Sequence, residues 1–269
     1  MWNWYPPRVP ASKKPKVTDS GAPRGAQTVH RALQILETFS PRHPALALAE
    51  LSSAVGLTVP TTHRLLRALH EKGFVVQDPN TKFYSLGPSI VRMAALVQGR
   101  DDVIVVAHPT MEQLRELSGE SVGFHWLVGD RRVCVHELVS DYPLRMASGV
   151  GNWYPLVAGA GGKAILANVS EARLDSILAK ADGFDSATLR RSLEDVRKRG
   201  YATSHGETVE GAAAIAVAIR RTSGEVIGAI NVTGPSNRLT ATRLEEISGP
   251  LLEAGRAVMR QLGHVETSS

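Results

Sequence analysis

The segment GAGGKA at 159–164 is the part of the chain whose composition comes nearest to a phosphate-binding loop. A Walker A loop requires the pattern GxxxxGK followed by Ser or Thr, whose hydroxyl binds Mg²⁺. In this chain Val157 stands in the place of the first glycine, and Ala164 follows Lys163. The Mg²⁺-binding hydroxyl is therefore missing, and the segment resembles a nucleotide loop only superficially.

Other catalytic patterns are incomplete as well. GVGNWY at 149–154 lacks the third glycine of a dinucleotide fingerprint, HEL at 136–138 lacks the second histidine of HExxH, and no GxSxG elbow occurs. The nine histidines show no metal-ligand spacing with Cys or carboxylates. We therefore predict no catalytic residue, no metal site and no cofactor. An enzyme that uses Lys163 or His136 as a base remains a poorly supported alternative, because no nucleophile–base pair is visible.

The stretch GLTVPTTHRLLRAL at 56–69 carries residues that suit nucleic-acid recognition. Thr58 is predicted to cap a helix, with its hydroxyl accepting a first-turn N–H. Pro60 then falls in the first turn, where its missing N–H costs nothing. Thr58 and Pro60, which would be unfavourable inside a helix, thus indicate where this helix starts.

The same helix predicts contacts with DNA. Pro60, Arg64 and Arg67 fall opposite the apolar positions, and a recognition helix reads base edges chiefly with its N-terminal residues. Thr bonds phosphates or bases, and Arg can fork onto guanine. A following hairpin, the wing, would add basic and aromatic contacts. The expected DNA-binding residues are Thr58, Pro60, Thr61, Thr62, His63, Arg64, Arg67, Lys82 and Tyr84.

Charge is distributed unevenly along the chain. Residues 1–90 hold 11 Lys/Arg and 5 Asp/Glu, a net +6, whereas residues 91–269 hold 20 and 21, a net −1. A basic segment indicates a polyanionic partner such as double-stranded DNA. Two alternatives stay open: a solvated helix face in a small bundle, and a module that contacts protein instead of DNA.

The elements that must position these residues follow from periodicity. Residues 1–25, rich in Pro, Lys and Ser, predict a disordered basic arm. Val29, Leu33, Leu36 and Phe39 have helical spacing. Helices at about 47–55 and 59–72 are predicted to end at Gly56 and Gly73, with the second burying Leu65, Leu66 and Leu69. FVVQD-PNT-KFYSL predicts a β-hairpin. Together these elements form a winged helix–turn–helix at 26–88.

A linker helix at 89–103 is predicted to lead to an α+β domain at 104–263, followed by a tail at 264–269. We expect helices at 104–118, about 160–168, 171–180 and 187–199, and from Thr240 to Leu262, the last kinked by Pro250. Strands are expected in SVGFHWLV, RVCVHELV and PLRMAS and at about 213–219 and 225–233. Cys134 lies mid-strand, where a buried, inert thiol is expected.

Overall composition is that of a globular protein: 269 residues, 43% hydrophobic and 21% charged. The single cysteine excludes an intramolecular disulfide. The N-terminus has no apolar core of a secretory signal, and the longest apolar run, AAAIAVAI, is too short to span a bilayer. These features predict a cytoplasmic protein without a membrane partner.

The chain resembles the IclR family of bacterial transcriptional regulators from about residue 27 to 263. The resemblance rests on RALQILETF, LAELSSAVGLTVPTTHRLLRALHEKGFV, KFYSLGPSIVRMA, PLVAGAGGKAILA, RGYATSHGETVEGAAAIAVAI and GAINVTGPSNRLT, whose order and spacing match. It implies an N-terminal winged helix–turn–helix, a GAF-like C-terminal domain that binds a small molecule, and a homo-oligomer, dimer or tetramer, on a palindromic operator.

The resemblance also implies where an effector binds. It points to the loop that begins the helix at 160 and to the strands behind it, where exposed N–H groups would suit a carboxylate. Asn231 and Thr233 share one strand face. The expected effector residues are Met146, Gly159, Ala160, Gly161, Ser204, Ala214, Asn231 and Thr233. The chain departs from the family at Ser204, Ala214 and Gly159, where an acidic residue, Cys and Thr are common.

These observations predict a one-component, DNA-binding transcriptional regulator, repressor or activator, whose DNA binding responds to a small organic-acid-like effector.

Overall fold

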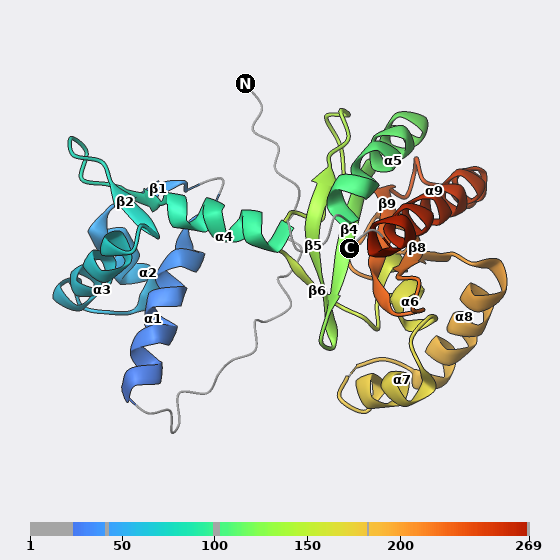
Figure 1. Cartoon of the computed structure of the whole chain (residues 1–269), viewed down its shortest axis with the longest axis horizontal. Helices are drawn as coiled ribbons and strands as arrows, with labels where there is room; N and C mark the ends of the chain where they lie inside the picture. The colour runs from blue at the N-terminus through green and yellow to red at the C-terminus, as the bar shows by residue number, and fades with distance from the viewer. Residues whose placement is uncertain (1–23, 41–42, 99–102, 182, 268–269) are drawn as a thin grey trace. The chain divides into compact units, whose positions relative to one another are not determined.

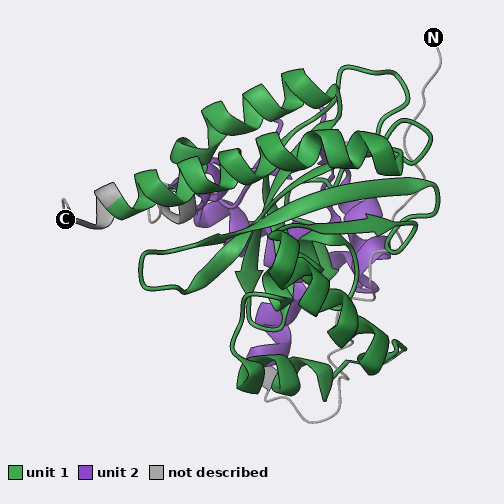
Figure 2. Ribbon diagram, turned by 90° about the vertical axis from the view of Figure 1, so that its right-hand side faces the viewer, with its two compact units in different colours: residues 1–14, 102–269 green, residues 15–101 purple. Residues whose placement is uncertain are grey.

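The computed structural model describes residues 24–267, apart from 41–42, 99–102 and 182. It divides between residues 101 and 102 into two compact units (Figure 2). We call the described residues 24–98 the N-terminal unit and the described residues 103–267 the C-terminal unit. Each is built around its own apolar core, so each is described by itself.

The N-terminal unit combines helices with a small antiparallel sheet of order β1-β3-β2. Strand β1 was not expected from the sequence. The elements are α1 (Arg24–Thr38), β1 (Ala45–Leu46), α2 (Leu48–Val55), α3 (Val59–Glu71), β2 (Val75–Gln77), β3 (Tyr84–Leu86) and α4 (Pro88–Gln98) (Figure 1).

Tight glycine turns separate α2 from α3 and α3 from the hairpin. Gly56 has φ 64° and Gly73 has φ 71°, a region that glycine adopts without steric cost. Both helix ends predicted at these glycines are confirmed. Strands β2 and β3 pair through Val76 and Ser85, which confirms the predicted hairpin.

The core of the N-terminal unit corrects one expectation about α1. Ile35 is fully buried and Leu36 packs against the core, but Val29 and Leu33 are 60% and 53% exposed. Leu36 and Phe39 therefore pack against the core as predicted, whereas Val29 and Leu33 do not, and Ile35 is a core residue that the prediction left out. The start of α1 also corrects the C-terminal boundary of the predicted arm at 1–25, because the helix already begins at Arg24. Residues 1–23 of that arm lie outside the described residues.

The C-terminal unit is a six-stranded antiparallel sheet of order β6-β5-β4-β9-β8-β7 with helices on both faces. Its elements are α5 (Val103–Ser118), β4 (Ser121–Val128), β5 (Arg131–Leu138), β6 (Trp153–Pro155), α6 (Ala160–Leu166), α7 (Glu171–Leu178), α8 (Ser186–Arg199), β7 (Ala202–His205), β8 (Ala212–Arg220), β9 (Val226–Pro235) and α9 (Ala241–Thr267).

Alternation along β8 places its side chains in two cores. Ile215 and Val217 pack with α5 and α9, which lie side by side (Figure 1). Ala216 and Ala218 face the opposite way, into the core shared with α6, α7 and α8. The small alanines allow α6 to lie close to the sheet, because their side chains add little height. We call this second surface the α6 face.

Several predicted boundaries in the C-terminal unit need correction. PLRMAS is not a strand; the third strand is β6, which begins at Trp153. Strand β7 was missed, and α9 continues past Leu262 to Thr267, so the tail expected from 264 is largely helical. Among the described residues no helix is long and apolar enough to cross a membrane.

Candidate functional sites

At the start of α3, Thr58 and Pro60 occupy the predicted positions, but the predicted side-chain cap is absent. Thr58 stands at the N-cap with extended backbone (φ −67°, ψ 148°), and Pro60 lies in the first turn. The Thr58 hydroxyl does not accept a first-turn N–H; it shares a 2.9 Å hydrogen bond with the Thr61 hydroxyl. The predicted side-chain cap is therefore wrong, and the two hydroxyls satisfy each other at the exposed helix end.

Two of the expected DNA contacts are part of the core. Thr62 is fully buried, and its hydroxyl donates to the Thr58 carbonyl at 3.2 Å. Tyr84 is 4% exposed and packs in the core of the N-terminal unit. Neither side chain can reach a partner molecule without unpacking, so we withdraw both from the predicted DNA surface.

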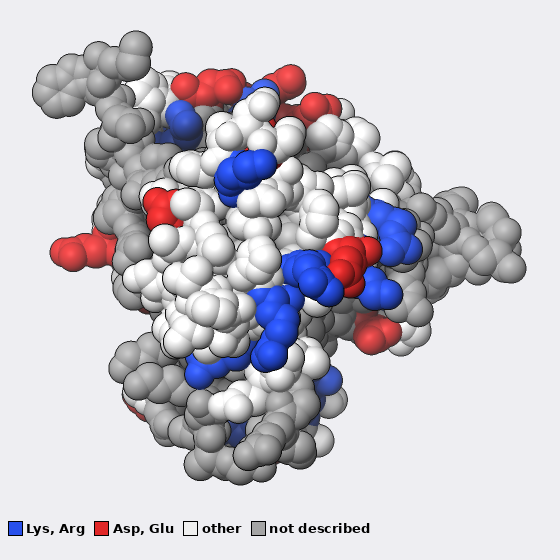
Figure 3. Space-filling model, turned by 90° about the vertical axis from the view of Figure 1, so that its left-hand side faces the viewer, with Lys and Arg blue, Asp and Glu red and all other residues white. Residues whose placement is uncertain are grey.

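The remaining predicted residues of α3 form one open face. Pro60, His63, Arg64 and Arg67 are exposed, while Thr61 is half-buried. Arg67 donates from Nε to Glu71 at 3.2 Å; within the described part of the chain, Arg64 has no hydrogen bond or ion pair. Figure 3, viewed from the side of the N-terminal unit, shows Lys and Arg side chains gathered in a band on this face.

The hairpin turn holds Lys82 in a rarely populated conformation. Lys82 has φ 61° and is the one non-glycine residue with positive φ in the described ranges. Asp78 fixes the turn, because its carboxylate accepts N–H bonds from Asn80 and Thr81 at 2.9 and 2.7 Å. These bonds also lower the pKa of Asp78. Lys82 is therefore exposed at a turn whose backbone conformation side chains rarely adopt.

The register of the large sheet brings most of the expected effector residues together. Ser204 pairs with Ala214, and Ala214 pairs with Thr233 on the next strand. Asn231 lies opposite Gly123 of β4 and bonds the Thr233 hydroxyl at 2.6 Å. Because Asn231 and Thr233 alternate with residues of the α5/α9 core, they lie on the α6 face.

The predicted N–H site at the start of α6 is already occupied by the chain itself. The Gly159 N–H donates to a Glu207 carboxylate oxygen at 2.9 Å, and the Lys163 ammonium donates to the other oxygen at 2.5 Å. Ala160 and Gly161 are buried behind them. Met146 is half-buried in the segment between β5 and β6.

Sequence reasoning missed the most unusual pair on the α6 face, Arg132 and His125. Arg132 is 4% exposed; it donates from Nη1 to His125 Nδ1 at 2.5 Å and lies 4.8 Å from the Tyr154 ring centre. His125 Nε2 lies 3.2 Å from the Ser148 hydroxyl. We name these four residues, together with Asn231 and Thr233, the polar cluster. Arg132 lies two positions before the buried Cys134, so strand alternation was the available signal.

Burial sets the charge states within the polar cluster. Desolvation, followed by the Arg132 charge, holds the pKa of His125 well below its usual value, so the ring is neutral and Nδ1 can accept. Desolvation also lowers the pKa of Arg132 to about 10, which still leaves it charged at neutral pH. A charged guanidinium thus lies inside the domain.

The residues considered for an enzyme do not converge. His136 bonds His108 of α5 at 2.9 Å, on the side of the sheet away from α6. Lys163 is engaged by Glu207 on the α6 face. No group of three metal-ligating side chains occurs among the described residues. The two candidate bases therefore lie on opposite faces of the sheet and cannot act on one substrate.

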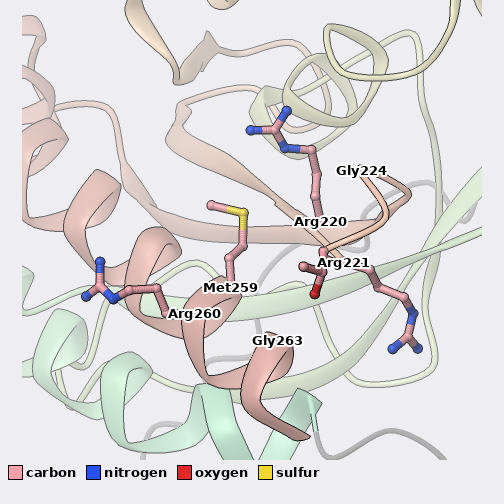
Figure 4. A pocket seen from close by; sticks show the side chains of 7 residues that line it. Arg220, Arg221, Gly224, Met259, Arg260 and Gly263 are labelled. Carbon is pink, nitrogen blue, oxygen red and sulfur yellow. The ribbon is translucent and has the colours of Figure 1, made fainter. Parts of the chain in front are cut away.

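A surface hollow of about 630 Å³ lies between the β8–β9 turn and α9. It is lined by Arg220, Arg221, Arg260, Met259 and neighbouring residues, none of which belongs to the expected effector set. Figure 4 shows the three arginine side chains pointing in different directions. They do not converge on one bound group, so this hollow is a poor ligand site.

A basic, exposed helix in a winged helix–turn–helix, joined to an α+β domain with buried polar groups, defines the class of one-component DNA-binding transcriptional regulators. Residues 28–79 match the family model of the IclR helix-turn-helix domain. Residues 95–260 match that of the bacterial transcriptional regulator IclR C-terminal domain. The chain belongs to the IclR family, and it is a transcriptional regulator and not an enzyme.

Relatives and solved structures agree with this assignment. The HTH-type transcriptional repressor AllR of Escherichia coli K12 is 31% identical over 258 residues, covering 93% of this chain and 95% of the relative. The transcriptional repressor IclR of the same organism is 28% identical over 267 residues, covering 95% and 97%. The crystal structure of the Thermotoga maritima IclR matches with a TM-score of 0.77 at 26% identity, covering 88% and 99%.

Proposed function

We propose that α3 is the recognition helix and that its N-terminal half enters the major groove of DNA. The observation that carries this proposal is the exposure of Arg64 without a partner in the described residues, while Leu65 and Leu66 anchor the same helix in the core. A side chain held this way costs little to redirect toward a guanine or a phosphate. Thr58, Pro60, Thr61, His63 and Arg67 complete the contact surface.

Lys82 would contact the DNA backbone from the wing. Its charge is exposed at the tip of a turn fixed by Asp78. A glycine would fit the same backbone without strain, so the presence of lysine there favours a role for its charge. Phosphate contacts of this kind position the protein and raise affinity without reading sequence.

The regulator would act as a homo-oligomer, dimer or tetramer, on a palindromic operator. Two exposed apolar side chains one turn apart on α1, Val29 and Leu33, support this arrangement. Apolar faces of this kind are typical of contacts between copies. A two-fold dimer presents two recognition helices to two half-sites related by the same symmetry. Its DNA partner would place it in the bacterial cytoplasm.

The C-terminal unit would bind a small organic-acid-like effector that shifts the equilibrium between DNA-competent and incompetent arrangements. The site would lie on the α6 face, where buried polar groups have gathered. Its expected residues are Ser204, Ala214, Asn231, Thr233, Gly159, Ala160, Gly161 and Met146. A structurally similar IclR homologue from Microbacterium hydrocarbonoxydans, 22% identical with a TM-score of 0.73, was solved in complex with 4-hydroxybenzoate, which makes that acid a reasonable first probe.

An electrophoretic mobility shift on the DNA upstream of the protein's own gene tests the proposal. Arg64→Ala should weaken binding by about 5- to 150-fold, because a good side-chain contact with a base contributes about 1–3 kcal/mol. Lys72→Ala is the matched control, since it removes one exposed positive charge at the other end of the helix. Wild-type affinity in both Arg64→Ala and Arg67→Ala would contradict the recognition-helix assignment.

A further inference from the structure

Two buried polar atoms on the α6 face have no hydrogen-bond partner among the described residues: Nε of Arg132 and Oδ1 of Asn231. The two residues are 4% and 5% exposed. A buried polar group without a partner is destabilising, and more so when it is charged. Arg132 Nε is a donor and Asn231 Oδ1 is an acceptor. A ligand that satisfies both must therefore carry one hydrogen-bond acceptor and one donor.

The side chains of Asn231 and Arg132 are connected through His125. A Cβ placed on Gly123 would lie 2.9 Å from Asn231 Oδ1 and 3.2 Å from His125 Nε2, so the two polar atoms lie on either side of the same small space. The other ring nitrogen of His125 receives the Arg132 guanidinium. The polar cluster is therefore continuous from Asn231 through His125 to Arg132.

Arg132 also lies against the beginning of α6. A Cβ on Gly159 would be 2.8 Å from Arg132 Nη2, and one on Gly161 would be 3.4 Å from Nη1. Small residues at both positions admit the guanidinium to the place where the sequence predicted effector contacts. The buried arginine and the predicted effector loop are thus in direct contact.

No carboxylate within the described residues forms an ion pair with Arg132, although the charge of Glu207 acts on it from a distance. Its hydrogen-bond acceptors are His125 Nδ1 and, at 3.4 Å, the Ala158 carbonyl, both uncharged. The Glu207 carboxylate is engaged by Gly159 and Lys163. The Glu137 carboxylate accepts the N–H groups of Ser148 and Gly149. Two buried cationic side chains, Arg132 and Lys163, thus share one carboxylate, and a bound anion in contact with Arg132 would reduce the cost of burying its charge.

We propose that Arg132 and Asn231 form a subsite for a hydroxy acid, a ligand that carries a carboxylate and a separate hydroxyl. The carboxylate accepts from the Arg132 guanidinium, and the hydroxyl donates to Asn231 Oδ1. Arg132 then determines that the effector is an anion. This proposal rests on the effector-binding role proposed above and adds the residues that would select the ligand.

The loop between β7 and β8 lies over the start of α6, beside Arg132. Glu207 and Thr208 of this loop lie over the start of α6, and Gly206 and Gly211 flank it with φ of 66° and 75°. Glu207 is held there by two hydrogen bonds and its side chain is 33% exposed. A ligand in contact with Arg132 would therefore lie beside this loop.

Thermal unfolding of the full chain with matched probes tests the subsite. The probes are lactate and 4-hydroxybenzoate, the uncharged lactamide and 4-hydroxybenzamide, and the unhydroxylated propionate and benzoate. At one hundred times its Kd, a hydroxy acid should raise the wild-type Tm by about 5 °C. Its amide should give no shift, and its unhydroxylated analogue should give a smaller one.

Arg132→Met tests the arginine itself, and Arg131→Met is its matched control. Arg131 is the adjacent strand residue, so its side chain points to the other face, where it lies over Trp153. Arg132→Met should abolish the acid-induced shift, and without ligand its Tm should equal or exceed that of wild type, because a buried charge without an ion-pair partner is removed. Arg131→Met should keep the shift.

Four results would overturn the subsite: no shift with either hydroxy acid, an equal shift with an amide, a shift retained in Arg132→Met, or an Arg132→Met chain that is unfolded or melts more than about 5 °C below wild type. DNA binding measured on the same samples separates the proposals. A chain that binds DNA but ignores the acids refutes the subsite alone. A chain whose Tm responds through Arg132 while its DNA binding does not respond refutes effector control alone.

Discussion

The Arg132 guanidinium lies 2.5 Å from Nδ1 of His125, and both side chains are buried between the sheet and α6. The contact requires a neutral imidazole, because a protonated ring would bring a second positive charge against the guanidinium. A pair that depends on one protonation state makes the stability of the C-terminal unit depend on pH.

His125 should make the protein less stable as pH falls below about 6.5, its unfolded-state pKa. Its folded pKa is well below that value, so the unfolded chain binds more protons in this range. The free energy of unfolding should decrease by up to about 1.4 kcal/mol per pH unit relative to His125→Gln. Urea unfolding of both proteins between pH 7 and pH 5 measures this difference. Parallel pH profiles would show that His125 does not titrate as described.

Lys82→Gly should separate stability from DNA binding. Glycine accepts the 61° φ of this position, so the variant should be as stable as wild type or up to about 1 kcal/mol more stable. Loss of the charge should weaken DNA binding severalfold. Denaturant unfolding and DNA titration of the same preparation provide both values. Undiminished affinity would remove the wing from the DNA surface.

Two helix glycines should respond differently to substitution by alanine. A Cβ on Gly162 of α6 would lie 2.3 Å from the Leu156 carbonyl oxygen, whereas one on Gly249 of α9 meets nothing within 4 Å. Gly162→Ala should lower the free energy of unfolding by about 2 kcal/mol or more through overpacking. Gly249→Ala should change it by less than about 0.5 kcal/mol, because crowding of the new Cβ by the following Pro250 offsets the gain in helix propensity. Equal effects in thermal or urea unfolding would contradict the close approach of α6 to Leu156.

The thiol of Cys134 should be inert in the native protein. It is fully buried, and burial followed by the Glu137 charge raises its pKa to about 12. Very little reactive thiolate therefore exists at neutral pH. Mass spectrometry after iodoacetamide treatment should find no adduct without denaturant and one adduct in urea. Rapid native labelling would mean that β5 opens readily.

The recognition helix was predictable because its signals are local. Gly56, Thr58 and Pro60 mark its start, and the leucines define its buried side. Thr62 precedes Leu65 and Leu66 by three and four positions, so the same spacing already places it inward, and its assignment to DNA was avoidable. The face of α1 was harder to predict, because Val29 and Leu33 are as apolar as the residues that the core uses.

The effector region was predictable only in part. Asn231 and Thr233 share a face by alternation, and the resemblance pointed to Gly159 and Ser204. Arg132 escaped notice because a lone arginine in a strand normally faces solvent, and only the sheet register and the packing of α6 bury it. The role of Glu207 was also not predicted, because its contact with Gly159 joins residues that are 48 positions apart in the chain.

The salt dependence of DNA affinity tests the central claim, that α3 delivers Arg64 to DNA. Fluorescence anisotropy with the upstream DNA should show affinity falling steeply as salt rises, because phosphate contacts release counterions. Arg64→Ala should bind at least about fivefold more weakly than wild type, and Lys72→Ala should remain close to wild type. Affinity that does not change with salt, or an Arg64→Ala variant that binds as tightly as wild type, would contradict the account.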